Sequence, residues 1–229
     1  MSLAYESFKA NSSDIDALMR IHSEQGGTKR GRRFDLSVLN RSAVVLITAC
    51  WEAYVEDICT EAYEFLLKKS TSHKQIPVKI RAAASAVLKK DEDHRRLWQL
   101  AGDGWKQVLS DYRHEVIGKR ISGFNTPRTD NVQALFRELL AIDDITSTWH
   151  WKNMSRDKAR SRLDDYVTDR CAIAHRTDIP EGTITKPYVI AYLGFINNIV
   201  LRVDNSVNDM LQESVGSSLL KWFLPDRRR

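Results

Sequence analysis

The fold of this chain depends first on residues 43–59, AVVLITACWEAYVEDIC. Apolar side chains fill nearly every position from Ala43 to Trp51, so on a helix they would cover most of its circumference. A surface helix carries apolar residues along one side only, so we expect this segment to be buried at the centre of the fold. The pattern around it predicts one long helix that begins near Ser37 and ends near Lys69.

Helical spacing of apolar residues recurs along most of the remaining chain. Residues that suit N-caps precede three of the segments, namely Asp35 or Ser37, then Asp130, then Ser155. The best candidate for a strand is the short β-branched run at 183–189. We therefore expect an all-α bundle of about six or seven helices. The predicted helices cover about residues 5–21, 37–69, 77–89, 130–142, 155–175 and 188–211, with shorter helical pieces around 95–101 and 105–116.

The chain has the length of one domain with extensions, and nothing in it marks a domain boundary. Its 229 residues include only 10 Gly and 5 Pro, with no internal repeat and no long linker. We expect a single domain over residues 1–229, with its core at about 35–211. Residues 1–34 would supply an N-terminal helix and a basic loop, and residues 212–229 a C-terminal tail.

Composition and motif content argue against several classes of protein. The longest apolar stretch, 43–51, is far shorter than the roughly 20 residues that cross a bilayer. The N-terminus lacks a secretion signal, so we expect a cytoplasmic protein with no membrane partner. The three cysteines form no Cys-x-x-Cys pair, so neither disulfides nor structural zinc are expected. No phosphate-binding loop, dinucleotide fingerprint or nucleophile elbow occurs, and nothing points to an organic cofactor.

The net charge of +5 does not describe a uniformly basic molecule. Four positive charges lie in residues 29–33, KRGRR, and three more in residues 227–229. Without these segments, 28 basic residues remain against 30 acidic ones. Net charge alone is therefore a weak indication of nucleic-acid binding. A third basic segment runs from Lys152 to Arg162 and precedes Arg170 in the sequence.

The segment richest in candidate chemistry is 164–178, DDYVTDRCAIAHRTD. Arg170 and His175 bracket four small or apolar residues that suit close helix packing. Five residues turn an ideal helix by about 140°, so the two side chains would share one face only if the helix ends near Ala174. In a purely structural alternative, Arg170 pairs with Asp169 or Tyr166 on the surface and His175 closes a helix, where the helix dipole favours an imidazolium.

The spacing of Arg170 and His175 resembles the Arg-x(4–6)-His motif of the HEPN superfamily (higher eukaryotes and prokaryotes nucleotide-binding). Residues 43–59 resemble the signature helix of its RiboL-PSP-HEPN group, and the likeness continues in order through 124–143, FNTPRTDNVQALFRELLAID, and 166–175. The resemblance implies an α-helical homodimer in which two Arg-x4-His motifs meet in a cleft and cut RNA without a metal. It also suggests a toxin of a toxin–antitoxin pair or a phage-defence effector, held in check by an antitoxin or another regulatory protein.

The chemistry of the two residues suits this expectation. Cleavage of RNA by its own 2′-hydroxyl needs a base for that proton, an acid for the 5′-oxygen and positive charge for the developing phosphorane. Histidine exchanges protons near neutral pH, so His175 can serve as base or acid. Arg170 offers a fork of donors that matches phosphate oxygens. One subunit has a single such histidine, so a two-fold axis that joins two copies would supply both groups.

Two residues depart from the usual motif of the family. A polar residue commonly follows the arginine and glycine often follows the histidine, whereas this chain has Cys171 and Arg176. Cys171 could donate a weak hydrogen bond and Arg176 could bind a phosphate, so both are kept as supporting residues. The departures leave open an alternative function, a non-catalytic helical module that binds RNA, a nucleotide or a protein. In a third alternative the chain is a scaffold.

Glu52 and Glu56 are the candidate supporting acids. On a helix they lie four residues apart on one face, from which the pair could orient Arg170 by a bidentate contact. The alternative is a solvated acidic stripe, and of the two acids Glu52 is nearer the apolar centre. No histidine or further carboxylate has the spacing to complete a metal site with them, so no metal is expected.

A tryptophan pair and the basic residues after it form the candidate RNA-binding surface. Exposed rings could stack bases while the cations hold phosphates. In the alternative, both tryptophans plug their loop into the bundle. The candidates are Trp149, Trp151, Lys152, Arg156, Lys158 and Arg160. Most of the remaining histidines are expected on the solvated surface; they are His22, His73, His94, His114 and His150.

Overall fold

The computed structural model describes residues 2–26, 36–90, 94–121, 126–175 and 182–219. Within these ranges the chain is all-α, as predicted, with seven α-helices, three short 3₁₀ helices and no strand beyond one isolated bridge between Trp151 and Met154. None of the described helices is both long enough and apolar enough to cross a membrane. The elements are α1 (Leu3–Gly26), α2 (Ser37–Lys69), η1 (His73–Gln75), α3 (Val78–Lys90), η2 (His94–Leu100), α4 (Gly104–Ile121), α5 (Thr129–Leu140), η3 (Ile145–Thr148), α6 (Arg156–Ala174) and α7 (Lys186–Val215).

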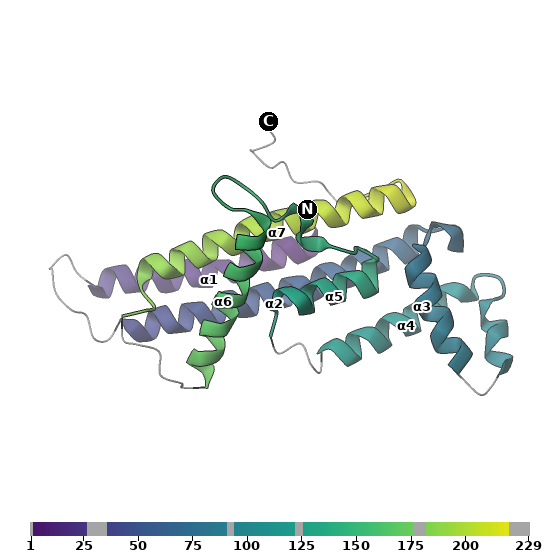
Figure 1. The fold of residues 1–229 in the computed structure, drawn as a ribbon, viewed down its shortest axis with the longest axis horizontal. Helices are drawn as coiled ribbons and strands as arrows, with labels where there is room; N and C mark the ends of the chain where they lie inside the picture. The colour runs from purple at the N-terminus through teal and green to yellow at the C-terminus, as the bar shows by residue number, and fades with distance from the viewer. Residues whose placement is uncertain (1, 27–35, 91–93, 122–125, 176–181, 220–229) are drawn as a thin grey trace.

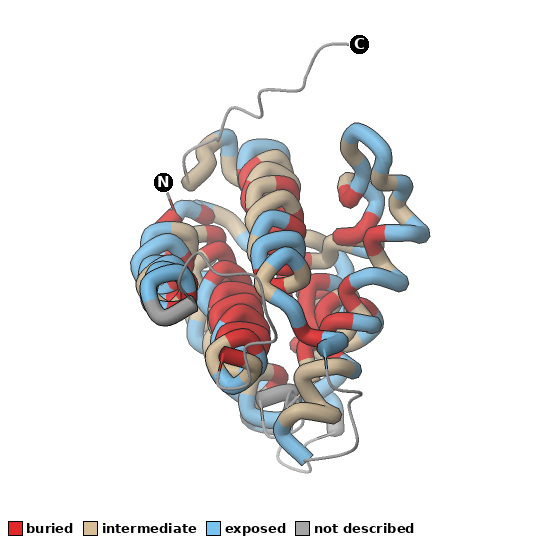
Figure 2. The backbone as a smooth tube through the Cα atoms, turned by 90° about the vertical axis from the view of Figure 1, so that its left-hand side faces the viewer, coloured by how far each residue is buried: buried red, intermediate tan, exposed pale blue. Residues whose placement is uncertain are grey.

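Helix α2 forms the centre of the molecule. It packs against α1, α4, α5, α6 and α7. Figure 1 shows α1, α2 and α7 along the long axis of the molecule, with α6 crossing them. Buried positions follow the sides of the helices that face one another (Figure 2), and Ile47, Trp51 and Ile58 of α2 have no exposed surface. The expectation that residues 43–59 lie at the centre is confirmed.

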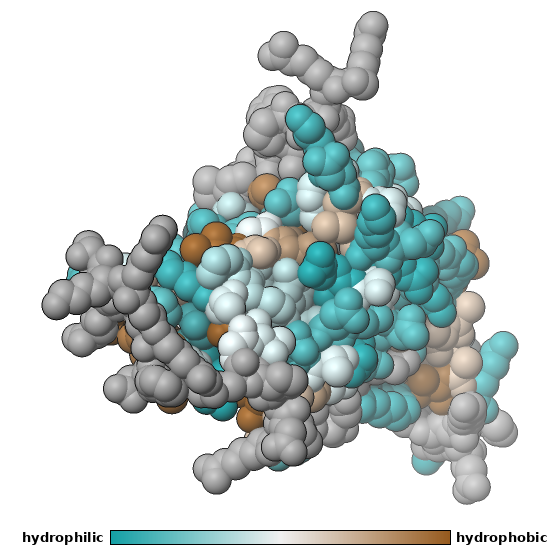
Figure 3. Space-filling model, turned by 60° about the vertical axis from the view of Figure 1, so that its left-hand side comes forward, coloured by the Kyte–Doolittle hydropathy of each residue, from teal (hydrophilic) through white to brown (hydrophobic). Residues whose placement is uncertain are grey.

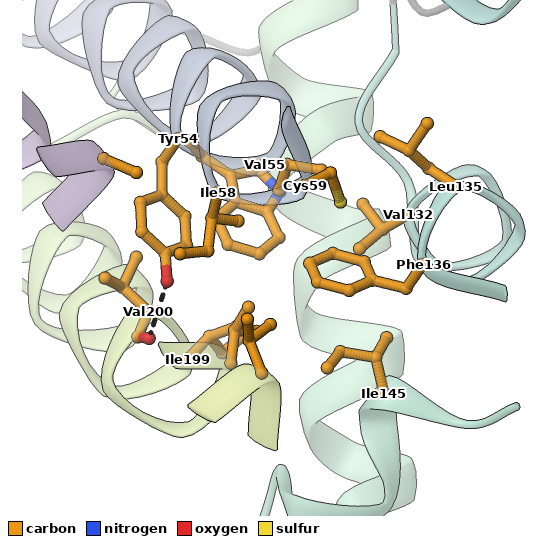
Figure 4. Packing of buried hydrophobic residues seen from close by; sticks show 14 of the residues in the cluster. Tyr54, Val55, Ile58, Cys59, Val132, Leu135, Phe136, Ile145, Ile199 and Val200 are labelled. Atoms are coloured by element: carbon orange, nitrogen blue, oxygen red, sulfur yellow. Dashed lines mark hydrogen bonds between the residues drawn. The ribbon is translucent and has the colours of Figure 1, made fainter. Parts of the chain in front are cut away.

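Three aromatic side chains of α2 fasten the neighbouring elements to it. Trp51 Nε1 donates to a backbone carbonyl just before α5 at 3.2 Å. The Tyr54 hydroxyl donates to the carbonyl of Val200 in α7 at 3.2 Å, within a core that α2, α5 and α7 share (Figure 4). The Tyr63 hydroxyl donates to a carbonyl of α4 at 2.8 Å. These groups are buried, so each bond replaces the water that the group loses on folding.

The first turn of α1 is held by acidic side chains from two other helices. The carboxylate of Glu61 in α2 accepts from the N–H groups of Leu3 and Ala4, both at 3.0 Å. Ser2 Oγ donates to Oδ1 of Asp204 in α7 at 2.6 Å. N–H groups that the helix itself cannot satisfy are thereby bonded, and the start of α1 is tied to α2.

Asp204 predicts a pH dependence of stability. Burial raises its pKa from 3.8 to about 6, although the hydrogen bond from Ser2 opposes the rise. Between these two pH values the folded protein holds a proton that the unfolded chain releases. The contribution of Asp204 to the free energy of unfolding therefore falls by up to about 3 kcal/mol as pH rises through this window. Above the window this contribution no longer changes with pH.

Urea unfolding of the wild type and Asp204→Asn at several pH values across this window measures the effect. The difference between the two proteins should grow in favour of the asparagine variant as pH rises. Asp16→Asn, which changes an exposed acid of α1, is the control and should follow the wild type. A difference between Asp204→Asn and the wild type that does not change with pH would contradict the prediction.

The predicted start of α2 is correct, but its cap is not. The N-cap position is held by Leu36, whose side chain makes no capping hydrogen bond, and Ser37 is the first residue of the helix. Asp35, the other candidate, lies outside the described residues. Tertiary packing supplies most of the stability of a buried helix, so α2 does not depend on a polar cap.

At α5 a residue from another helix replaces the expected cap. Arg128 occupies the N-cap position and Asp130 lies in the first turn, so the prediction that Asp130 caps this helix is wrong. Asp164 of α6 instead accepts from the N–H of Thr129 at 2.8 Å. At α6, Ser155 is the N-cap, as predicted, and its Oγ accepts a backbone N–H of the first turn.

The strand candidate at 183–189 is wrong. Thr185 caps α7 through its Oγ1, which accepts from the N–H of Tyr188 at 3.3 Å, and Pro187 lies in the first turn. A proline is tolerated there because its missing N–H would have had no partner within the helix. The β-branched residues therefore lead into a helix that begins at Lys186, two residues before the predicted start at 188.

The expected exposure of the histidines is confirmed for His73, His114 and His150. It is wrong for His22, which is 8% exposed. His22 follows Ile15 and Met19 at helical spacing, so it falls on the buried stripe of α1. The side chain of His94 lies outside the described part of the chain.

Candidate functional site

Helix α6 leads directly to both residues of the candidate motif. Ala159, Leu163 and Val167 recur at helical spacing on its buried side, which packs against α2. Arg170 follows Val167 by three residues and so continues this stripe. Its side chain is partly buried. The guanidinium therefore extends from the inward side of α6, at the edge of the packed core, rather than from its outer face.

The surroundings of Arg170 are acidic and aromatic. Burial raises the pKa of Glu52 in α2, and the positive charge of Arg170 opposes that rise. Burial also raises the pKa of Tyr192 in α7, where the hydrogen bond with Thr48 and the charge of Arg170 both act in the other direction. Arg170 thus lies near enough to α2 and α7 for its charge to act on residues of each helix.

The guanidinium of Arg170 has hydrogen-bonding capacity that the chain does not use. Its Nε is buried and has no hydrogen-bond partner in the described structure. No ion pair joins Arg170 to Glu52 or Glu56 within the described ranges, so the bidentate contact expected from the sequence is absent there. A buried donor without a partner is unusual in a folded protein. The planar fork of arginine matches the oxygen atoms of a phosphate.

Glu52 and Glu56 are partly buried neighbours on α2 rather than a fully solvated stripe. Burial raises the pKa of Glu56, and the negative charges of Glu52 and Asp57 add to the rise. Of the two acids, Glu52 is the one on which the charge of Arg170 acts. Within the described ranges, no three histidine, cysteine or acidic side chains converge as metal ligands.

Three tyrosines that were not among the predicted site residues hold the end of α6 in place. Tyr166 of α6 stacks on Tyr192 of α7, with ring centroids 3.9 Å apart, and meets Tyr188 edge-on at 5.3 Å. The Tyr188 hydroxyl donates to Asp169, the residue before Arg170. Asp169 is therefore engaged by α7, which differs from the alternative in which it pairs with Arg170. The four-residue spacing of Tyr188 and Tyr192 places both on one face of α7, but it does not indicate which helix that face contacts.

His175 occupies the C-cap position of α6. The helix ends at Ala174, which is where the spacing argument required it to end. The backbone N–H of His175 donates to the carbonyl of Cys171 at 3.0 Å, and the residue is exposed to solvent. Cys171 itself is partly buried against the core. Arg176, the other departure from the family motif, lies outside the described residues.

Trp149 belongs to the core and not to a surface for RNA. Its side chain is fully buried and meets Trp51 edge-on, with ring centroids 6.3 Å apart. The prediction that it stacks a base is wrong, because no face of the ring reaches solvent. The alternative, in which the tryptophan packs its loop into the bundle, is right for this residue. Trp151 is partly buried, packs on Phe195 at 5.7 Å and has the Arg202 guanidinium 4.7 Å from its ring centroid. One ring face of Trp151 is thus covered by a cation of the same chain.

The four basic candidates divide into two groups. Arg156 forms an ion pair of 2.7 Å with Asp144, and Arg160 lies 3.6 Å from an acid of α5. Lys152 and Lys158 are exposed and form no ion pair with any described residue. The described surface in the view of Figure 3 is mostly hydrophilic, with a narrow apolar band. The two lysines are therefore the cations best placed to bind an external anion.

Comparison with known proteins yields one match. The family model described as RiboL-PSP-HEPN matches residues 9–209, a range that contains α2, α6 and most of α7. No curated protein and no solved structure matches the chain. The matched range includes both the central helix and the positions of Arg170 and His175.

Proposed function

Because the chain belongs to the RiboL-PSP-HEPN family, we propose that it is a metal-independent endoribonuclease whose reaction depends on Arg170 and His175. Family membership by itself supports a coarser statement, a ribonuclease or a nucleotide-binding module. The observation that carries the finer proposal is the Arg170 guanidinium. Its Nε is buried without a partner in the described structure, five residues before the exposed His175.

In the proposed reaction the 2′-hydroxyl of RNA attacks the adjacent phosphorus. His175 takes the proton of this hydroxyl, the bond between the 2′-oxygen and phosphorus forms, and the bond between phosphorus and the 5′-oxygen breaks. Arg170 neutralises the negative charge that develops on the non-bridging oxygens. One product ends in a 2′,3′-cyclic phosphate and the other begins with a 5′-hydroxyl.

The leaving 5′-oxygen needs a proton, and one chain has a single His175. In the proposal two copies of the chain therefore form a two-fold homodimer, in which one His175 acts as base and the other as acid. The position of His175 supports this arrangement. It lies exposed at the end of a helix, where a side chain is able to reach across a contact between two subunits.

The contacts around Arg170 support its role as a preorganised donor. The stack of Tyr166 on Tyr192 fixes the last turns of α6 against α7, and the bond from Tyr188 to Asp169 fixes the residue next to Arg170. A phosphate that approaches would meet a guanidinium whose backbone is already held. Little reorganisation is then needed as charge develops in the transition state.

Lys152 and Lys158 are expected to bind RNA phosphates, because exposed cations without ion pairs readily replace the counterions of the phosphates. Replacing both with glutamine should weaken affinity for single-stranded RNA about threefold to tenfold and reduce the salt slope of log affinity by about 1.4. Fluorescence anisotropy at several salt concentrations measures both quantities. Arg156→Gln removes a cation already bonded to Asp144 and is the matched control. Equal losses of affinity in the two proteins would refute a specific role for the lysines.

The proposed function is tested by incubating a 5′-labelled RNA with the purified protein in EDTA. The wild type should cleave it, whereas Arg170→Ala and His175→Ala should leave it intact. His150→Ala, which changes another exposed histidine, is the control and should cleave at the wild-type rate. RNA left intact by a folded wild type, or equal cleavage by all four proteins, would overturn the proposal.

In the cell, the proposed activity would serve a toxin or antiviral effector that a partner protein, such as an antitoxin, restrains. Uncontrolled RNA cleavage stops growth, so expression of the wild type without the partner should arrest a culture. Arg170→Ala and His175→Ala should each relieve the arrest at equal protein level. Arrest that persists in both variants would separate the toxicity from this site.

A non-catalytic module that binds RNA, a nucleotide or a protein is the second candidate. Cys171 favours it, because a weak hydrogen-bond donor packed against the core stands where the family commonly has a polar residue. In that case the wild type would bind RNA without cutting it, and Arg170→Ala would weaken binding alone. The cleavage assay in EDTA therefore distinguishes the two functions.

A further inference from the structure

A second candidate site lies among α3, α4, η1 and the end of η2. The structure has a cavity of about 460 Å³ there. Three polar side chains line it, from His73, Arg81 and Ser85, and Trp105, Val108 and Leu109 line it with apolar surface. Figure 1 shows α3 and α4 at the end of the molecule away from α6. The cavity is of the size that small molecules occupy in proteins.

The walls of this cavity are fixed by contacts outside it. The Tyr63 hydroxyl of α2 donates to the carbonyl of Leu109 at 2.8 Å and so holds α4. Lys79 at the start of α3 forms an ion pair of 2.5 Å with Asp143. The turn before α4 depends on Gly104, since a Cβ there would meet the carbonyl oxygen of Gln99 at 1.9 Å. The cavity is therefore formed before any ligand binds.

The polar side chains of the cavity keep hydrogen-bonding capacity that no described residue uses. Arg81 Nε donates to the carbonyl of Ile76 at 3.0 Å, which orients the guanidinium and leaves its two Nη groups without a hydrogen bond or ion pair there. The ring of His73 meets Trp105 edge-on at 6.5 Å, with no hydrogen bond to its nitrogens.

Ser85 is the third polar side chain of the cavity. Several helical serines of this chain, such as Ser12, Ser23 and Ser206, donate to the carbonyl four residues before them. The Ser85 hydroxyl makes no such bond and lines the cavity instead. Donors from η1 and α3 are thus available in the same cavity as the apolar surface.

The charge around the cavity selects an anion. Among the described residues no acidic side chain lines it, and Lys106 adds a positive charge 5.4 Å from the ring centroid of Trp105. We propose that the cavity binds an amphipathic organic anion. Its carboxylate, sulfonate or phosphate head bonds Arg81 and His73, and its apolar body packs on Trp105 and Leu109. This site is separate from Arg170 and does not depend on the proposed ribonuclease activity.

Two fluorescent probes of similar aromatic body test the proposal on the full chain. The first, 1-anilinonaphthalene-8-sulfonate, carries an anionic head, and the second, N-phenyl-1-naphthylamine, carries none. Arg81→Gln should weaken binding of the sulfonate about tenfold, the loss expected when one charge-assisted bond is removed, and change binding of the neutral probe less than about twofold. Arg137→Gln, which changes an exposed arginine of α5, should leave both affinities unchanged.

Ser85→Trp provides the second variant, because an indole at this position fills the cavity and should abolish binding of both probes. A thermal melt of each variant shows whether it is folded. Sulfonate binding that Arg81→Gln leaves unchanged would overturn the proposal, as would equal weakening of both probes or a wild type that binds neither. If Ser85→Trp fails to fold, the comparison of the two probes with Arg81→Gln still decides the outcome.

Discussion

Replacing His175 with alanine should lower the rate of RNA cleavage at least about a thousandfold, because the proposed dimer loses its base and its acid together and each such group contributes about 10²–10⁴. The affinity for RNA should change less than about threefold, since in the proposal His175 transfers protons while Arg170 and the two lysines bind the phosphates. Single-turnover cleavage of a labelled RNA measures the rate, and binding is measured separately by anisotropy.

The controls for this prediction come from the same chain. His150→Ala removes an exposed imidazole at the opposite end of α6 and should keep the wild-type rate. Arg170→Lys keeps a positive charge but loses the fork of donors, so its rate should fall about a hundredfold while RNA still binds. A His175→Ala protein that retains a tenth or more of the wild-type rate would remove His175 from the reaction.

Replacing Trp149 with alanine should lower the free energy of unfolding by about 3–5 kcal/mol, because a fully buried indole leaves a large cavity. The ring packs edge-on against Trp51 of the central helix, so its loss also disturbs the centre of the core. Trp98→Ala is the matched control. Trp98 is 81% exposed, and its loss should change stability by less than about 0.5 kcal/mol.

Urea unfolding followed by circular dichroism measures this difference. Trp149→Phe is a milder variant. The indole N–H of Trp149 has no hydrogen-bond partner in the described structure. Replacing the indole with a phenyl ring therefore removes side-chain volume but no hydrogen bond. We expect Trp149→Phe to recover more than half of the lost stability. If Trp149→Ala were as stable as the wild type and only weakened RNA binding, the tryptophan would be a surface residue after all.

The sequence was sufficient for the fold class because apolar spacing reports burial directly. Residues 43–59 could fit only a central helix, and the structure has them in α2. The caps were harder to predict, because a cap is a local pattern that a distant residue can replace. Asp164 of α6 satisfies the first N–H of α5, and no spacing within α5 indicates this.

The candidate site was predicted in part. The motif drew attention to Arg170, and its position follows from the buried stripe of α6, which the spacing of Leu163 and Val167 already implied. Its neighbours Tyr188 and Tyr192 come from a different helix, and contacts between helices depend on packing that a single sequence does not contain.

The misplaced tryptophan has a similar cause. Trp149 lies among polar and basic residues, so its local sequence resembles a surface loop. Its burial depends on Trp51, nearly a hundred positions earlier in the chain. For the same reason the basic residues could be counted from the sequence, but the structure was needed to separate Arg156, which is bonded to Asp144, from the exposed Lys158.

The central claim is that Arg170 and His175 promote attack by the 2′-hydroxyl of RNA without a metal. The most direct test is the chemical nature of the product ends, determined in EDTA for an RNA and for the same sequence with 2′-deoxy nucleotides at the cleaved positions. The account predicts 2′,3′-cyclic phosphate and 5′-hydroxyl ends from the RNA, no cleavage of the deoxy substrate and no products from His175→Ala. Products with 3′-hydroxyl and 5′-phosphate ends, or cleavage of the deoxy substrate at the same rate, would contradict it.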